Sequence, residues 1–193
     1  GGADVNQPDP LDMYGWGSTP LHFACGRACQ PDKCLKIIEA LLQAGANPNA
    51  KRANYTGETP LHYTVKQDSP EELRLLVKHG GDIRAVSDEG NTPMSLALGE
   101  LKVSQVAVLQ ELGISINTQI GKFSSGLVSA IKKKRGDILS RYLEMGADPN
   151  FTADEGETPL VSCIHQNQVE LIHILLAAGA DIQAKNSQGN TFM

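Results

Sequence analysis

A period of 33 residues organises this chain and restricts its fold more than any other feature. The tetrapeptide Thr-Pro-Leu-His begins at Thr59, and related tetrapeptides begin at steps of 33 residues, at Thr92, Ser125 and Thr158. The same tetrapeptide also begins at Thr19, 40 residues before Thr59. A fixed period of this length is typical of supersecondary units that stack on one another.

Each unit carries the signals of two short helices and an extended loop. Thr59 is a suitable helix N-cap, and Pro60 fits the first helical position, where its missing N–H would have no partner. An apolar segment follows at 73–77, and Gly80 comes where a helix C-terminus favours a residue with positive φ. Neither helix could bury its apolar face alone, so we expect neighbouring units to stack.

These motifs resemble those of the ankyrin repeat family. The opening Gly-x-Thr-Pro-Leu-His stands at 17–22 and 57–62, and the closing Leu-Leu-x-x-Gly-Ala stands at 41–46 and 175–180, with a looser version at 142–147. The resemblance covers essentially the whole chain. It implies an all-α repeat solenoid, in which helix-turn-helix units are joined by hairpin loops.

We therefore predict a single ankyrin repeat domain over residues 1–193, with five full units and a partial unit at each end. The partial units are 1–14 and 188–193, and the full units span about 15–54, 55–87, 88–120, 121–153 and 154–187. Because both ends fall inside a repeat, we expect the chain to be a fragment of a longer protein. The apolar residues Leu171, Ile174 and Leu175 of the fifth unit should then be incompletely covered.

Two units depart from the regular pattern. The motif Thr and the closing Gly are 26 residues apart in the first full unit and 21 in the second, which places five additional residues between the helices. We expect them in a loop, because stacked repeats tolerate insertions there. In the fourth unit Ser125 and Gly126 replace Thr and Pro, and Gly weakens a helix by up to about 1 kcal/mol relative to Ala. The first helix of this unit should be the least protected.

Composition and charge exclude several classes of function. The net charge of −5 gives no support to nucleic acid as a partner. No apolar run approaches the roughly 20 residues that span a bilayer, and the N-terminal residues lack the segments of a signal peptide. Four unevenly spaced cysteines fit a reducing compartment. We predict a cytoplasmic monomer, located in the host-cell cytosol if the protein is a bacterial effector, that binds neither nucleic acid nor membrane.

The histidines and acidic pairs favour structural roles over catalysis. His22 and His62 belong to the opening motif, and we expect each imidazole to hydrogen-bond the motif Thr or neighbouring backbone. A catalytic histidine requires a nucleophile or base beside it in a cleft, and no such set recurs in the chain. The acidic pairs at 88–89 and 154–155 lie two units apart, so we interpret them as solvated hairpin tips. We predict no enzymatic activity and no cofactor.

Two other clusters have a functional and a structural interpretation. Cys25, Cys29 and Cys34 lie near His22 around the inserted segment, and zinc uses such donors. A second close cysteine pair is missing, however, so we favour free thiols and no metal. The basic run 132–135 is compatible with a nuclear signal or an anion-binding patch, but a solvated turn between two helices is the interpretation that we favour.

The family resemblance also gives the hairpin asparagines a role. In ankyrin repeats this Asn commonly satisfies turn backbone, and it can be hydroxylated where an acidic and an aliphatic residue precede it. The residues at or near this position are Asn6, Asn49, Asn117 and Asn150. Only Asp4-Val5-Asn6 matches the hydroxylation preference well.

The resemblance implies a protein–protein interaction module that binds a partner protein or peptide. Ankyrin repeats bind mainly through hairpin tips and the exposed face of the first helices, which together form a concave groove. The position four residues after each motif residue faces this groove in the family. In this chain that position is occupied by Phe23, Tyr63, Leu96, Ser129 and Ser162.

Aromatic and basic residues gather at these positions in the N-terminal half. Aromatic residues make up only 5% of the chain, so their concentration there favours a binding site. The predicted partner-binding residues are Tyr14, Trp16, Phe23, Arg27, Lys51, Arg52, Tyr55, Tyr63, Lys66 and Leu96. Such a groove suits an extended or helical peptide with apolar anchors and some acidic residues.

Two alternatives place this module in a larger protein. One is a targeting or substrate-recruiting domain of an enzyme or bacterial effector whose catalytic part lies outside this chain. The other is a cytosolic assembly module of a membrane channel. Flanking catalytic motifs or transmembrane segments would distinguish them.

Overall fold

The computed structural model shows helices joined by turns and loops. It describes residues 4–8, 17–26, 31–53, 56–117, 126–151 and 157–183. Within these ranges the chain forms ten α-helices and no strand. The chain divides into two compact units, residues 1–96 and 97–193.

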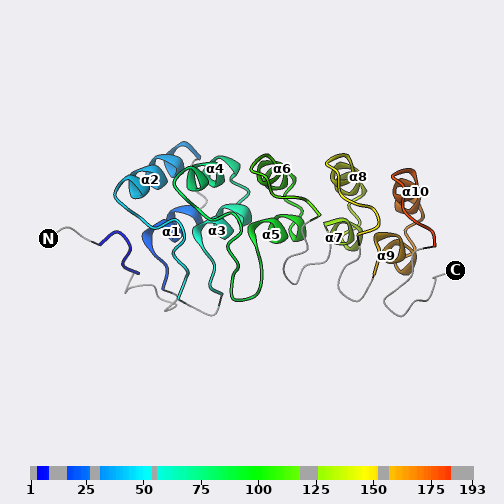
Figure 1. Ribbon diagram of the computed structural model, residues 1–193, viewed down its shortest axis with the longest axis horizontal. Coiled ribbons are helices and arrows are strands. Elements are labelled where there is room, and N and C mark those ends of the chain that lie inside the picture. The colour runs from blue at the N-terminus through cyan, green and yellow to red at the C-terminus, as the bar shows by residue number, and fades with distance from the viewer. Residues whose placement is uncertain are drawn as a thin grey trace. The chain divides into compact units, whose positions relative to one another are not determined.

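The first compact unit contains two helix pairs and the beginning of a third. The four helices of these pairs are α1 (Pro20–Gly26), α2 (Pro31–Gln43), α3 (Pro60–Lys66) and α4 (Pro70–Lys78). A further helix, α5 (Pro93–Gly99), starts in this unit. Helix α1 packs beside α3 and α2 packs beside α4, so the first and second helices of successive repeats form two adjacent rows (Figure 1).

The second compact unit repeats the arrangement. Its helices after α5 are α6 (Val103–Glu111), α7 (Gly126–Lys132), α8 (Gly136–Glu144), α9 (Pro159–His165) and α10 (Val169–Ala177). Helix α7 packs beside α9, and α8 contacts both α6 and α10. The sequence-based prediction of stacked helix pairs is confirmed in both units.

The predicted helix signals act where they were expected. Thr59 is the N-cap of α3 and Pro60 is its first residue. In α9 the Thr158 side chain accepts a hydrogen bond from the Val161 N–H at 3.3 Å. Gly80, just after α4, has a φ of +88°, which a residue with a side chain rarely adopts.

Contrary to our expectation, most of the five additional residues of the first full repeat lie in a helix and not in a loop. Helix α2 has 13 residues, whereas its equivalent α4 has nine, so four of the five lengthen the second helix. The connection before α2 is longer by only one residue, 27–30 against 67–69. A helix extended at one end keeps its packing register against its neighbour, and for this reason the stack accommodates the insertion.

Gly126 is required by packing and is not simply a weak helix start. A Cβ atom at this position would lie 2.6 Å from Leu98 Cδ2 and 3.1 Å from Tyr142 Cε2. The Tyr142 side chain is fully buried. The missing side chain therefore makes room for an aromatic ring of α8. Helix α7 is seven residues long, as α3 is, so the glycine does not shorten it. Ser125 lies outside the described residues.

The apolar face of the last repeat is covered at two of the three residues that we expected to be exposed. Leu171 is 8% exposed and Leu175 is fully buried, so the expectation is wrong for both, and Ile174 is half-buried. Both leucines lie on α10, the helix that packs against α8 and α9. The exposed apolar side chains of this region are instead Ile164, Val169, Leu176 and Ile182.

The hairpin asparagines join successive repeats. Asn49 Nδ2 donates to the Gly80 carbonyl at 2.8 Å, and its Oδ1 accepts from the Asp82 N–H at 2.7 Å. The backbone that Asn49 satisfies therefore belongs to the turn of the next repeat. The same pair of hydrogen bonds is made by Asn6, Asn117 and Asn150. Their hydroxylation stays a prediction.

The turns between the two helices of four repeats contain residues other than glycine with positive φ. They are Asp68 (57°), Leu101 (61°), Lys134 (55°) and Asn167 (53°). Asp and Asn tolerate this left-handed conformation, whereas it costs Leu and Lys about 1–2 kcal/mol. The sequence pattern had not indicated this strain. No helix of the described residues is long and apolar enough to cross a membrane.

Candidate partner-binding surface

Two buried histidines hold the hairpin loops of the first compact unit. His62 Nδ1 lies 2.9 Å from Thr59 Oγ1 and accepts from the Thr59 N–H at 3.1 Å, while Nε2 lies 3.0 Å from the Asn91 carbonyl. A backbone N–H can only donate and a carbonyl can only accept. His62 is therefore the neutral tautomer with its proton on Nε2. It ties the start of α3 to the next hairpin.

His22 makes the equivalent set of contacts one repeat earlier. Its Nδ1 accepts from the Thr19 N–H at 3.2 Å, and its Nε2 donates to the Glu58 carbonyl at 3.1 Å. The same carbonyl accepts from the Arg52 N–H at 3.0 Å. Burial lowers the pKa of both histidines below 6.5, which agrees with neutral imidazoles. The predicted structural role of the motif histidines is confirmed.

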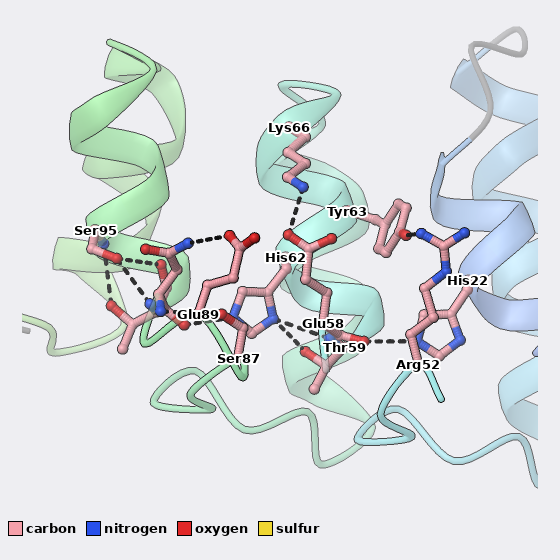
Figure 2. Close-up of polar contacts among 12 residues, drawn as sticks. His22, Arg52, Glu58, Thr59, His62, Tyr63, Lys66, Ser87, Glu89 and Ser95 are labelled. Carbon is pink, nitrogen blue, oxygen red and sulfur yellow. Dashed lines mark hydrogen bonds and ion pairs between the residues drawn. The ribbon is translucent and has the colours of Figure 1, made fainter. Parts of the chain in front are cut away.

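Tyr63 projects from α3 beside the hairpin that these bonds fix, and it is half-buried. Its ring packs edge-on against His22, with centroids 5.8 Å apart. Its hydroxyl accepts from Arg52 Nη1, and the Arg52 guanidinium lies 5.7 Å from the ring centroid (Figure 2). On α1, a Cβ atom at Gly26 would lie 3.0 Å from Tyr63 Cδ1, so the lack of a side chain there gives the ring its place.

Lys66 and Glu58 complete the polar frame of Tyr63. Lys66 Nζ lies 2.5 Å from Glu58 Oε1 and 5.8 Å from the centroid of the Tyr63 ring. The two members of the ion pair differ in exposure: the Lys66 side chain is 36% exposed and the Glu58 side chain 5%. The pair, drawn in Figure 2, therefore exposes mainly its positive member.

The structure brings three of the ten predicted partner-binding residues, Arg52, Tyr63 and Lys66, together around one ring. Phe23 lies on α1, the helix that packs beside α3, and we call these four half-buried residues the Tyr63 surface. Lys51 is exposed nearby in sequence, and its Nζ lies 3.7 Å from Asp88 Oδ1. The predicted residues Tyr14, Trp16, Arg27 and Tyr55 lie outside the described residues.

Leu96 does not share this exposure. Only 3% of its surface is accessible, so it offers almost nothing to a partner, in contrast to our expectation for this repeat position. Ser129 at the same position is half-buried. Ser162 is fully buried, and its hydroxyl donates to Glu157 Oε1 at 2.7 Å. The position therefore has no fixed exposure from one repeat to the next, and the two serines show that residue type does not decide it.

Sequence reasoning missed two residues of this site, Gly26 and Glu58. Gly26 follows its motif Thr by seven residues, and the next repeat has Lys66 at this position. A glycine in one repeat together with an aromatic residue, Tyr63, in the next is a usable signal of close packing between them. Glu58 precedes the motif Thr and lies eight residues before Lys66. That spacing has no regular period, so only the fold shows that the two side chains pair.

In the basic run 132–135, two side chains have contacts within the chain. Lys133 Nζ donates to the Gly99 carbonyl at 2.8 Å. Arg135 binds Asp137 with two hydrogen bonds, of 2.9 and 2.6 Å, and these bonds lower the pKa of Asp137 to about 2. The run thus serves local structure, as we favoured.

The cysteines correct one expectation. Cys25 and Cys163 are free and buried, and burial raises the pKa of both thiols. Cys34 is disulfide-bonded, so the prediction of free thiols is wrong for this residue. Its position at the start of the lengthened α2 is where the first repeat departs from the regular pattern. Cys29 lies outside the described residues. Within the described ranges there is no group of three or more His, Cys, Asp or Glu residues suited to a metal.

Comparison with known proteins agrees with this architecture. A family model described as ankyrin repeats in three copies matches residues 26–120, and a model of a single ankyrin repeat matches residues 155–187. The solved ankyrin repeat domain of Bcl-3 superimposes with a TM-score of 0.79 at 25% identity, covering 97% of this chain and 79% of that one.

Two curated proteins illustrate the sequence similarity. The B-cell lymphoma 3 protein homolog of Mus musculus is 28% identical over 166 residues, which is 86% of this chain and 36% of the relative. The putative E3 ubiquitin-protein ligase XBAT34 of Arabidopsis thaliana is 33% identical over 99 residues, which is 51% of this chain and 24% of the relative. The chain thus spans about a third or less of the length of either relative.

Proposed function

Because this chain belongs to the ankyrin repeat family, we propose that it binds a partner protein or peptide through the Tyr63 surface. Ankyrin repeat domains are in general protein–protein interaction modules, and the all-α repeat solenoid is the fold that this chain shares with them. The proposal adds which part of the fold meets the partner.

The observation that carries the proposal is that the Tyr63 ring is partly exposed yet already fixed. His22, Arg52 and Gly26 each border the ring, and Arg52 also binds its hydroxyl. A side chain that is ordered before binding loses little conformational entropy on binding. Tyrosine and arginine are also enriched among residues that dominate binding energy. Tyr63 thus combines a favourable residue type with a preorganised setting.

Residues at the border of this surface extend the proposal. Lys51 is exposed on the hairpin that precedes α3. Tyr14, Trp16, Arg27 and Tyr55 stay sequence-based predictions for the same site. Leu96 is left out because of its burial.

The remaining expectations about partners and location are part of the proposal. The net charge of −5 supports a protein partner over nucleic acid. We propose that the protein is a cytoplasmic monomer that has no catalytic activity of its own and does not bind membranes. Cysteine usage is divided, since Cys25 and Cys163 are free and Cys34 is disulfide-bonded. Cell fractionation and analytical ultracentrifugation test the location and the oligomeric state.

The test uses peptides selected on the protein itself. Random peptides displayed on phage are selected against the wild-type chain, and the affinity of the enriched peptides is measured by calorimetry for wild type, Tyr63→Ala and Ser129→Ala. Truncating a dominant aromatic residue typically costs about 2 kcal/mol or more of binding free energy. We expect this loss for Tyr63→Ala and no change for Ser129→Ala, which changes the same repeat position.

A fold control accompanies these variants. Tyr63→Phe keeps the ring and removes only the hydroxyl that Arg52 binds. It should retain most of the affinity, and circular dichroism should show native helix content in all three variants. Equal affinities for Tyr63→Ala and Ser129→Ala would place the binding site elsewhere on the chain.

A second candidate function is favoured by the lengths of the relatives. The matched region is only 24% of a protein named as a putative E3 ubiquitin-protein ligase. The module is then the targeting or substrate-recruiting part of a larger enzyme. The sequence on either side of these residues in the natural protein tests this, since a catalytic domain would be recognisable there.

A further inference from the structure

We propose that the partner segment carries an aspartate or glutamate whose carboxylate lies against Lys66 beside the Tyr63 ring. The inference rests on the proposed function and adds the chemistry of the partner. It follows from how charge is distributed between buried and exposed positions around Tyr63.

The first step is the asymmetry of the Lys66–Glu58 ion pair. The Glu58 side chain is 5% exposed, whereas that of Lys66 is 36% exposed. A partner that approaches this surface therefore meets the ammonium group and not the carboxylate. Because the buried carboxylate fixes Lys66 by a contact of 2.5 Å, the ammonium is also held in place before binding.

The second step is that a second cation, Arg52, also lies beside the Tyr63 ring. Arg52 and Lys66 lie 5.7 and 5.8 Å from the ring centroid. Glu58 brings one carboxylate to these two cations. His22 and His62 add no charge, because each accepts a backbone N–H at Nδ1 and is therefore neutral. The surface around the ring is thus positive on the side that faces a partner.

The third step limits where the acidic residue binds. Lys51 and Asp88 are both about half exposed, so their charges cancel at the border. Glu89 lies on the next hairpin, where its Oε2 accepts from Asn91 Nδ2 at 3.2 Å (Figure 2). A second carboxylate of the partner near Glu89 would be repelled. The surface therefore suits a segment with an acidic residue at the Tyr63 end, and not a uniformly acidic one.

The same charges disfavour a polyanion such as a nucleic acid. The whole chain carries a net charge of −5. Nucleic-acid binding relies on many phosphate contacts at once, whereas this surface offers two cations. A single carboxylate beside an aromatic ring matches what is present, with the apolar part of the segment on Tyr63 and Phe23.

The experiment uses two substitutions of the ion pair that should act in opposite directions. Phage-selected peptides from the wild-type chain are measured by calorimetry against Lys66→Gln and Glu58→Gln. Lys66→Gln removes a cation that the partner meets, so affinity should fall about threefold to tenfold. Glu58→Gln removes the buried negative charge that offsets Lys66, and this gain should outweigh the loss of the contact that fixes the ammonium, so affinity should rise about twofold to fivefold. If the ion pair served only to stabilise the fold, both variants would weaken binding.

Two controls keep the result interpretable. Glu157 occupies the same repeat position as Glu58 three repeats later, and Glu157→Gln should leave affinity unchanged. The double variant Glu58→Gln and Lys66→Gln avoids leaving a buried carboxylate without its partner. It should fold like wild type by circular dichroism and should still bind more weakly.

The outcomes separate this inference from the proposed function. Selected peptides that contain aspartate or glutamate, together with opposite effects of the two variants, support the inference. Peptides that depend on Tyr63 but lack acidic residues, or equal weakening by both variants, overturn the inference and leave the proposed function standing. Peptides whose binding is unchanged in Tyr63→Ala overturn both.

Discussion

Replacing His62 tests whether the motif histidine joins two repeats. The buried ring makes contacts at both ends: Nδ1 meets the N–H and hydroxyl of Thr59, and Nε2 donates to the Asn91 carbonyl at 3.0 Å. Ser95 shows what remains when only one end is satisfied. Its hydroxyl accepts from the Thr92 N–H at 2.8 Å and donates to the Thr92 carbonyl. Among the described residues, it makes no hydrogen bond to the following hairpin.

The expected losses follow from these contacts. His62→Ala leaves the Thr59 N–H without a partner, at about 1–3 kcal/mol, and leaves a cavity. The Asn91 carbonyl loses one of two hydrogen bonds, at about 1 kcal/mol, and keeps the one from the Ser87 N–H. The total should be about 3–5 kcal/mol. His62→Ser can restore the bond to Thr59, which is typically worth about 1 kcal/mol, so it should cost about 2–4 kcal/mol. Ser95→Ala is the matched control and should cost about 1 kcal/mol.

The pH dependence provides a second readout. Burial lowers the pKa of His62 below 6.5, so the unfolded chain binds the proton more readily than the native chain. Stability is therefore fully present above about pH 6.5 and decreases as the pH falls below it. Protonation of each of the two buried histidines, His22 and His62, can lower the free energy of unfolding by up to about 1.4 kcal/mol at pH 5.5. His62→Ser should lose less than wild type over this range, whereas Ser95→Ala should follow wild type.

Urea denaturation followed by circular dichroism at about pH 7.5 and 5.5 measures these differences. The reasoning is refuted if His62→Ser is as stable as wild type, because the bond to the Asn91 carbonyl would then contribute nothing. It is also refuted if the wild-type and His62→Ser proteins lose the same stability on acidification.

Three further predictions concern stability measured by the same denaturation assay. Burial raises the pKa of Glu72 from 4.5 to about 7, so the contribution of this carboxyl to stability is present at low pH and lost as the pH rises through 7. At about pH 8, Glu72→Gln should therefore be more stable than wild type by on the order of 1–2 kcal/mol. Equal stability of the two proteins would contradict this. Lys134→Gly should stabilise by about 0.5–1 kcal/mol because it relieves a left-handed φ of 55°, while Asn167→Gly, at the same repeat position, should change little. Gly126→Ala should destabilise by about 1–3 kcal/mol, although Ala is the better helix former, since the new Cβ would meet the buried Tyr142 ring; a gain in stability would show that the ring can move.

The repeat motif allowed much of the fold to be predicted, because its signals are local. Thr59 and Pro60 start a helix through groups within one turn, and Gly80 ends one through its own φ. The role of His62 was also predictable, since the motif places it three residues after Thr59. The bond to Asn91, 29 residues away, depends on the stacking of the next repeat.

The candidate site was predictable in part. The choice of Tyr63, Arg52 and Lys66 came from residue type and repeat position, and the structure places them around one ring. Leu96 has the same repeat position and is buried, because exposure depends on the neighbours that pack against a residue and not on its place in the motif.

By itself, the sequence determined the family, the helix pairs and the positions of their caps, because these depend on contacts within one repeat. The tertiary structure alone decided which substitutions are tolerated and which charges reach the surface. Gly126 is a packing requirement only because Tyr142 of α8 lies against it, and α2 absorbs most of the insertion that local pattern assigned to a loop. Glu58 is hidden and Lys66 exposed because the hairpin and α3 meet there. Burial is a property of neighbours brought together by stacking, and a repeat read in isolation does not contain them.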